Sequence, residues 1–269
     1  MGYQLRRFLP ILLLAVACLY TYKLEVRETH VYAASGITRL DARTQNGAIS
    51  VTASPDTVIV DSVLKYAYGR DRADAEEAVE NVVYSDTVVG DELRVKAEMP
   101  SGSRPYGAGF TIAAPESTDL SLATTNGDVS VTNMVGDINV GTTNGKVVLT
   151  GTTGTASVST TNGRLNVAVH SGAFYGATTN GAIDCDIAAL RPGETVGLST
   201  TNGKVTLLLP DDVSALIDAT NSNGLITIYD FTVTYETQAE NHMRARIGSG
   251  ASTVTITTTN GDVVVRSRS

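Results

Sequence analysis

The sequence repeats one short phrase, Thr-Thr-Asn-Gly, and no other feature limits the possible folds as strongly. The phrase begins at residues 124, 142, 160, 178, 200 and 258, with the variants TQNG at 44 and NSNG at 221. From Asn126 to Asn180 the asparagines follow one another every 18 residues, and the next two gaps are 22 and 21 residues. Self-similarity at a fixed interval indicates a repeat architecture.

The residues on either side of each asparagine alternate between apolar and polar. Positions three and five after the asparagine are apolar in every unit, as in Val129 and Val131. Positions six and four before it are apolar or small, as in Leu120 and Leu122. Strict alternation is typical of a strand with one buried face. Each unit therefore predicts two short strands that are joined at an Asn-Gly corner.

Two arrangements of these strands are possible. Asn-Gly is the favoured two-residue turn of an antiparallel hairpin, which allows a meander. A meander, however, requires neither a common spelling of its turns nor a common interval. In a solenoid each asparagine lies above its copy in the previous coil, at a strand spacing of about 4.8 Å. The sequence therefore favours an all-β fold, a flattened parallel β-solenoid (β-helix-like) with two short strands per coil of 18–22 residues.

Stacked corners predict specific roles for the repeated residues. Asparagine side chains in one column can bond amide to amide along the axis. The following glycine is expected to supply a left-handed conformation, and the threonine two places before the asparagine is expected to bond corner backbone groups. A second threonine column, beside the corner, should face solvent, and ice binding by it is disfavoured because each coil presents only one such residue. The predicted corner ladder consists of Asn126, Asn144, Asn162, Asn180 and Asn202, and the outward threonines are Thr125, Thr143, Thr161, Thr179 and Thr201.

Residues 37–269 form the predicted solenoid domain, in which 119–269 carry the TTNG repeats and 52–118 interrupt them. Within this insertion, residues 71–83 have apolar side chains at near-helical spacing, which predicts one amphipathic helix. Runs rich in β-forming residues flank it at 57–68 and 92–98. We expect this strand, helix and strand insertion to cap one end of the solenoid, whose edge would otherwise invite aggregation.

Residues 1–22 are typical of an export signal. A basic pair, Arg6 and Arg7, precedes an apolar run over 8–19 that is shorter than the span of about 20 residues needed to cross a membrane. Cys18 follows small residues and is a candidate lipidation site. An uncleaved membrane anchor and ordinary cleavage after Ala17 remain open. All three alternatives place the body of the protein outside the cytoplasm, with residues 23–36 as a polar tether.

Three motifs carry a family resemblance. An NG-x-I-x-V strand lies at 46–51, Glu-Glu-Ala lies at 76–78 in the predicted helix, and TTNG-x-[VIL] repeats follow. With the export signal, these features resemble the bacterial adhesin family of β-strand-repeat envelope proteins, a domain of unknown function, over about residues 37–269. The resemblance implies a surface location, a β-solenoid-like body and a binding or scaffolding role, and it carries over no catalytic residues.

Composition excludes several functions. The chain has 20 Lys and Arg against 28 Asp and Glu, a net charge of −8, which would repel a phosphate backbone, so nucleic acid is not an expected partner. Two cysteines and three histidines leave little for a metal site, and no calcium-binding repeat or loop is present. No catalytic, cofactor or metal residue is predicted.

A few residues could still carry chemistry. Cys185 occupies an apolar position of its coil and is expected to be a buried structural thiol. Asp184 and Asp186 flank it on the outer face, where paired carboxylates could hydrolyse glycosides at a suitable separation, although a solvated face is favoured. His170 should face solvent. His30 and His242 have no partner in the motif, and the tyrosines around the insertion, Tyr66, Tyr68, Tyr84 and Tyr106, mark the first place to seek a ligand.

These observations favour a non-enzymatic, exported cell-envelope protein, tethered to a membrane, that presents its solenoid for adhesion, binding or scaffolding. Its expected partners are the membrane, through the N-terminal anchor, and an envelope protein or a surface glycan. Two alternatives remain open. One is a carbohydrate-active solenoid enzyme that uses surface carboxylates, and the other is a regulatory sensor of envelope stress.

Overall fold

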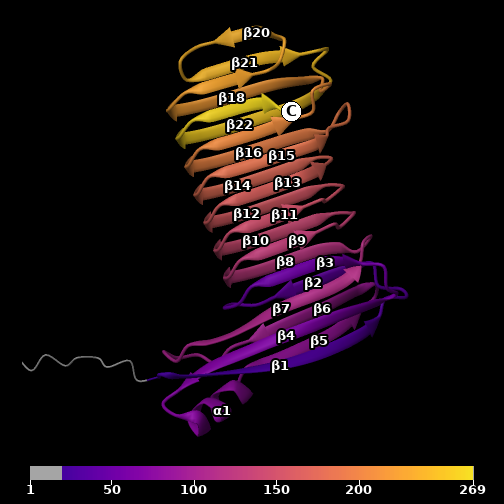
Figure 1. Ribbon diagram of the computed structural model, residues 1–269, viewed down its shortest axis with the longest axis vertical. Helices are drawn as coiled ribbons and strands as arrows, with labels where there is room; N and C mark the ends of the chain where they lie inside the picture. The colour runs from indigo at the N-terminus through magenta and orange to yellow at the C-terminus, as the bar shows by residue number, and fades with distance from the viewer. Residues whose placement is uncertain (1–19, 269) are drawn as a thin grey trace, which may run out of the picture.

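Two β-sheets face each other along the body of the molecule, and the chain passes from one to the other at every asparagine corner (Figure 1). The computed structural model describes residues 20–268. Residues 1–19 of the predicted export signal, which include Cys18, lie outside the described residues. No helix within residues 20–268 is long and apolar enough to cross a membrane.

Sheet A has 11 strands and sheet B has 12. In spatial order sheet A consists of β1 (Tyr22–Ala33), β4 (Val58–Gly69), β7 (Tyr106–Pro115), β3 (Ile49–Ser54), β9 (Val129–Thr132), β11 (Val147–Thr150), β13 (Leu165–Ser171), β15 (Ile183–Ala189), β17 (Val205–Leu209), β23 (Val263–Ser267) and β19 (Ile226–Tyr229). Sheet B consists of β20 (Val233–Gln238), β21 (His242–Ile247), β18 (Ala215–Asn223), β22 (Ser252–Asn260), β16 (Thr195–Asn202), β14 (Phe174–Asn180), β12 (Ala156–Asn162), β10 (Ile138–Asn144), β8 (Asp119–Asn126), β2 (Arg39–Arg43), β6 (Glu92–Glu98) and β5 (Val83–Val89).

The predicted β-solenoid is confirmed. Successive coils pair in parallel and in register, so that Val140 lies between Leu122 and Val158. On sheet A, Leu149 lies between Val131 and Val167 in the same way. The inward columns from both sheets are almost completely buried and form one continuous core. Burial of each such aliphatic side chain contributes about 1.5–3 kcal/mol, which is why the alternating pattern decides the fold.

The first and last coils lie inside the stack and not at its ends. The N-terminal coil, β2 and β3, lies between the β6 and β7 coil and the β8 and β9 coil. The C-terminal coil, β22 and β23, lies between the β16 and β17 coil and the β18 and β19 coil. After β19 the chain forms the hairpin of β20 and β21, in which β21 pairs antiparallel with β18 and closes that end of sheet B. From there the chain can return to the inner position of β22 and β23. The order of coils in space therefore differs from their order in the sequence.

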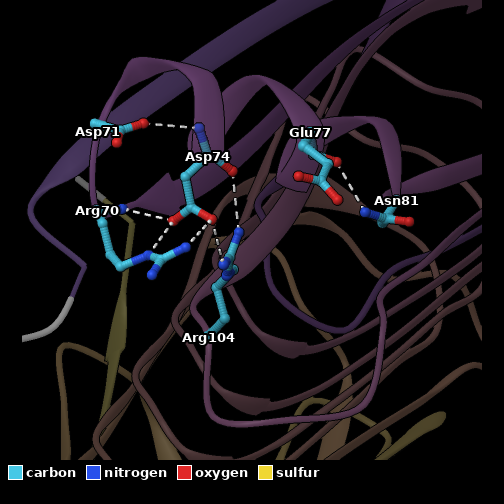
Figure 2. A network of polar contacts seen from close by, with 6 residues as sticks. All are labelled: Arg70, Asp71, Asp74, Glu77, Asn81 and Arg104. Carbon is cyan, nitrogen blue, oxygen red and sulfur yellow. Dashed lines mark hydrogen bonds and ion pairs between the residues drawn. The ribbon is translucent and has the colours of Figure 1, made fainter.

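The helix α1 (Arg72–Glu80) falls within the predicted range and packs Ala75, Ala78 and Val79 inward. Asp71 begins it by accepting a hydrogen bond from the Asp74 backbone N–H at 2.9 Å, as a helix N-cap does. Asn81 ends it through a 2.8 Å bond from its side-chain amide to the Glu77 carbonyl (Figure 2).

The carboxylate of Asp74 joins this helix to two neighbouring segments (Figure 2). It accepts 2.7 Å and 2.9 Å bonds from the Arg70 backbone N–H and the Arg104 guanidinium. Together with the Arg70 guanidinium, these donors lower the pKa of Asp74 to about 2. Arg104 also donates to the Asp74 carbonyl, so the loop before β7 is fixed to α1. We call β1, β4 and α1, which lie together at one end of the molecule, the cap (Figure 1).

The expected tether over residues 23–36 is wrong. Residues Tyr22–Ala33 form β1, which pairs antiparallel with β4 along its whole length. Leu24 and Val26 face inward and pack against the small cluster of Ala67, Ala78 and Val79 under α1. The same apolar and polar alternation that defines the repeat is present here, among charged residues, and it makes this segment the edge strand of sheet A.

The glycine after each asparagine is required by space, and the expected left-handed backbone is found at only two of the corners, Gly224 with φ +142° and Gly261 with φ +157°. Gly127, Gly145, Gly163 and Gly181 have no φ in the left-handed region. A Cβ on Gly163 would lie 1.8 Å from the carbonyl oxygen of Gly145, and the other corners are equally close. Only glycine allows neighbouring coils to approach in this way.

Candidate functional site

The asparagine corners form one continuous column of hydrogen bonds. From Asn126 onward, each side-chain amide donates to the side-chain oxygen of the preceding asparagine in the column at 2.7–2.9 Å, and the five predicted ladder residues follow one another directly. In space the column runs Asn46, Asn126, Asn144, Asn162, Asn180, Asn202, Asn260 and Asn223. Because each amide is already bonded to its neighbours, this column serves the stacking of coils.

The threonine two places before each asparagine bonds the corner backbone. Thr142, Thr160 and Thr178 each donate at 3.0 Å to the carbonyl of the corner glycine in the preceding coil. These hydroxyls are buried, and a buried carbonyl left without a donor would cost about 1–3 kcal/mol. The neighbouring threonines, such as Thr143 and Thr161, are exposed.

Cys185 is fully enclosed between Val167 and Leu207 of the adjacent coils. Burial raises the pKa of its thiol far above the ordinary value. A neutral, enclosed thiol is a poor nucleophile, so this residue contributes packing to the core.

We therefore expect Cys185 to resist thiol reagents. In a Cys18→Ser variant, which leaves Cys185 as the only thiol, native protein should react with a maleimide at least 100-fold more slowly than protein in denaturant, because the thiolate forms only on opening. Time-resolved mass spectrometry measures both rates. Equal rates would show that Cys185 is accessible.

His170 is buried, and the expectation that it faces solvent was wrong. The strand β13 is irregular here: Val169 has φ +61° and is exposed, and the pairing with β15 shifts between Val167 and His170. This bulge turns the imidazole inward, where it bonds Thr152 Oγ1 at 2.9 Å and the Ala173 carbonyl at 3.1 Å. Burial lowers the pKa of His170, and both ring nitrogens have protein partners.

The other polar candidates are engaged in pairs. Asp184 lies 3.3 Å from Arg164, and Asp186 lies 2.6 Å from Arg268. Outside the repeat, His242 bonds Asp218 at 2.9 Å, and His30 stacks on Tyr84 with ring centroids 4.3 Å apart, while its buried Nε2 makes no hydrogen bond within residues 20–268. Nothing in these contacts brings two free carboxylates together.

The cap contains the most strongly perturbed acid, Asp61 on β4, which lies directly opposite His30 of β1. Its side chain is buried, and one carboxylate oxygen accepts a 3.0 Å bond from the Tyr84 hydroxyl, which in turn bonds the Tyr32 hydroxyl at 2.8 Å. The other carboxylate oxygen has no hydrogen-bond partner within residues 20–268. Burial raises the pKa of Asp61 to about 6, against the opposing effect of the Tyr84 bond.

This acid predicts a pH dependence of stability. Because the folded state binds the proton more tightly than the unfolded chain, stability is lost as pH rises from about 4 to about 6, by about 3 kcal/mol. Asp61→Asn should raise the free energy of unfolding at pH 7.5 and remove this loss. Urea unfolding at pH 4.5 and 7.5 measures it, with the exposed Asp212→Asn as control. Equal stabilities of wild type and Asp61→Asn at pH 7.5 would contradict the assignment.

The outer faces of the two sheets differ sharply in charge. On sheet A, ion pairs such as Lys146 with Asp128 and Arg164 with Asp184 cross between neighbouring coils. On sheet B, the strands β10, β12, β14, β16 and β22 contain no charged residue. We call their outward residues the sheet-B face: Asn139, Gly141, Thr143, Ser157, Ser159, Thr161, Tyr175, Ala177, Thr179, Thr195, Gly197, Ser199, Thr201, Thr253, Thr255, Thr257 and Thr259.

Tyr175 is the one aromatic residue of the sheet-B face and is 46% exposed. It pairs with Ser157 on one side and Gly197 on the other. A Cβ on Gly197 would lie 3.1 Å from Tyr175 Cδ1 and 3.6 Å from Cε1, so this edge of the ring faces the glycine. Sequence reasoning missed Tyr175, although the repeat places it five residues before its asparagine, where other coils have Ser121, Asn139 and Ser157.

A shallow hollow of about 480 Å³ lies over the beginning of β8, β10 and β12, and Ser157 in its lining pairs with Tyr175 of the next strand. Its floor includes Ser121, Asn139 and Ser157, which pair in register across the three strands. Asp119 and Asp137 lie at its rim. The sheet-B face therefore offers polar groups and one aromatic surface in a continuous row.

Residues 23–266 match the domain family described as Toastrack DUF4097. The chain belongs to the Toastrack DUF4097 family. The match begins inside β1, so the Toastrack domain includes the strand that the sequence analysis assigned to a tether. No curated protein matches the sequence significantly.

Several solved structures are similar to this Toastrack protein at low identity and low TM-score. A candidate cell adhesion protein from Clostridium sporogenes is 13% identical, with 91% of this chain and 100% of that chain covered and a TM-score of 0.40. A candidate adhesin from Bacteroides fragilis is 14% identical, with 90% and 97% covered and a TM-score of 0.46. A candidate lipid-binding protein from Parabacteroides distasonis is 10% identical, with 90% and 97% covered and a TM-score of 0.32.

Proposed function

We propose that this protein is exported, is held at a membrane by its N-terminal residues, and acts by binding through the sheet-B face and not by catalysis. The observation that carries the proposal is the contrast between the two outer faces. A flat face without charge over five strands leaves neutral polar groups and one aromatic ring as its means of recognition. Aromatic residues with polar neighbours are typical of binding surfaces.

The placement of the chain's beginning supports an anchored orientation. The described chain enters at the cap, where the Tyr20 ring lies 4.7 Å from the Arg104 guanidinium beside α1. An anchor formed by residues 1–19 would therefore hold the cap toward the membrane. The repeat coils would extend away from it (Figure 1), with the sheet-B face accessible along their length.

The paired acids argue against the enzymatic alternative. Asp184 and Asp186 each contact an arginine on sheet A, whereas a glycosidase requires two carboxyl groups that flank a bound substrate. We propose binding as the activity for this reason, with an envelope protein or a surface glycan as the partner class.

Labelling of the full chain in its native host tests location and accessibility together. Ser159 is exposed on the sheet-B face, and we expect a membrane-impermeant maleimide to label Ser159→Cys in cells whose cytoplasmic membrane is intact. Wild type is the matched control, because it has the same Cys18 and enclosed Cys185 and lacks only the new thiol. The protein should also sediment with membranes. Labelling of Ser159→Cys only after lysis, or recovery of the whole protein in the soluble cytoplasmic fraction, would contradict the proposal.

A further inference from the structure

The ring of Tyr175 is held ready as a flat contact surface. The ring edge that carries Cδ1 and Cε1 faces Gly197 of the next strand, where a Cβ would lie 3.1 Å and 3.6 Å from these atoms and would crowd the ring. The residue is 46% exposed. An aromatic ring with two rotatable bonds, placed in this way, can take up a ligand with little loss of side-chain entropy.

The hollow over β8, β10 and β12 holds hydrogen-bonding groups that the protein does not use. The side chains of Ser121, Asn139 and Ser157 make no hydrogen bond to another protein group within residues 20–268, and neither does the carboxylate of Asp137. Hydroxyl, amide and carboxylate groups together offer both donors and acceptors. Successive strands place them about 4.8 Å apart, in one row that ends at Tyr175.

The charges around the hollow disfavour an anionic ligand. The one cation that lines it, Arg39, is paired with Asp91 at 2.7 Å. Glu92 at the rim is paired with Arg94. Asp119 and Asp137 would repel an anion, while the five strands of the sheet-B face supply no charge of either sign. Phosphorylated and acidic ligands are therefore disfavoured.

We infer that the row Ser121, Asn139, Ser157 and Tyr175 binds a neutral polysaccharide chain, which crosses the strands with one sugar ring stacked on Tyr175. A pyranose ring presents an apolar face of C–H groups to an aromatic ring and hydroxyl groups at its edge, which match the exposed tyrosine and the polar row. This inference rests on the proposed function, since it names the ligand class of the sheet-B face.

Affinity electrophoresis of the purified full chain tests the inference. Gels that contain dextran, a mixed-linkage β-glucan or galactomannan supply neutral probes, and polygalacturonate supplies an anionic one. We expect at least one neutral polysaccharide to retard the wild type. Tyr175→Ala should weaken this binding at least tenfold, as removal of an aromatic anchor does, whereas Tyr175→Phe should retain it.

Tyr229→Ala is the matched control, because Tyr229 is 50% exposed on β19 of sheet A. Its binding should equal that of the wild type. The inference is overturned if no neutral probe retards the wild type, if only polygalacturonate does, or if Tyr175→Ala and Tyr229→Ala behave alike. A dimer in sedimentation that Tyr175→Ala abolishes would also overturn it, since the occupant would then be a second copy. Labelling of Ser159→Cys in cells is independent of these results, so failure here leaves the proposed function standing.

Discussion

Truncation of the chain after Gly250 is expected to unfold residues 211–250, which precede the deletion. Residues 251–269 supply β22 and β23, whose Val254, Ile256, Val263 and Val265 are fully buried. Loss of these four side chains removes about 6 to 12 kcal/mol of burial, which is comparable to the whole stability of an ordinary domain. Because this coil separates the β16 and β17 coil from β18 and β19, residues 211–250 should lose their neighbours.

Limited proteolysis with mass spectrometry measures this outcome. The truncated chain should be trimmed back to near residue 210, whereas the coils of Asn126 to Asn202 stay protected, because stability in a repeat protein depends on adjacent units. Protection of residues 213–247 in the truncated chain would contradict the inserted position. Two single substitutions check the same point. Ile256→Ala in the inserted coil should lower the free energy of unfolding by about 2–5 kcal/mol. Ile228→Ala in the outermost coil should lower it by less, because Ile228 is half-buried.

Among substitutions of one small residue by another, we expect Gly163→Ala to lower the free energy of unfolding the most. The new Cβ would lie 1.8 Å from the Gly145 carbonyl oxygen, so the two coils must separate at the corner. Separation would weaken the bonds that Asn162 and Thr160 make to the coil of Asn144. We expect a loss of more than about 3 kcal/mol, at the upper end of the cost of overpacking, measured by urea unfolding.

Gly141→Ala is the control for this prediction. Gly141 lies in the same sheet region, on β10, and a Cβ there would meet only the Ser159 hydroxyl at 3.8 Å, an ordinary contact. Its stability should stay within about 0.5 kcal/mol of the wild type, as for most surface substitutions. Equal losses in Gly163→Ala and Gly141→Ala would show that the corner glycines are not needed for close approach of the coils.

The repeat made the solenoid predictable because its information is local. Alternation assigns each side chain to one face, and a fixed interval aligns Asn126 with Asn144 without knowledge of the rest of the chain. The order of the coils in space, in contrast, is not local information. Whether Asn260 follows Asn202 or Asn223 depends on where the β20 and β21 hairpin packs, and the alternation within one coil does not specify its neighbours in space.

Errors at single residues also have physical causes. The bulge at Val169 reverses the faces of β13, so period-two counting placed His170 on the wrong side. Asn-Gly suggested a turn conformation, whereas the close approach of neighbouring corners, which only the stacked structure reveals, explains Gly163.

The candidate site could have been predicted from the same alignment of the repeats that predicted the fold. Comparison of outward positions, as well as inward ones, singles out Tyr175 among serine, asparagine, glycine and threonine. The tyrosines near the insertion were named as the first place to seek a ligand only because several of them occur there. In the structure Tyr84 contributes to the buried cluster around Asp61, and Lys23 lies 4.9 Å above the Tyr66 ring.

Binding of face-specific charge variants to isolated cell walls of the native host tests the central claim most directly. Ser159→Glu places one carboxylate on the sheet-B face, and Asn166→Glu places one on the outer face of sheet A, at positions that are both exposed. If the sheet-B face is the binding surface, wild type and Asn166→Glu bind equally, and Ser159→Glu binds at least tenfold more weakly. Equal binding by all three proteins, or a loss confined to Asn166→Glu, would contradict the account.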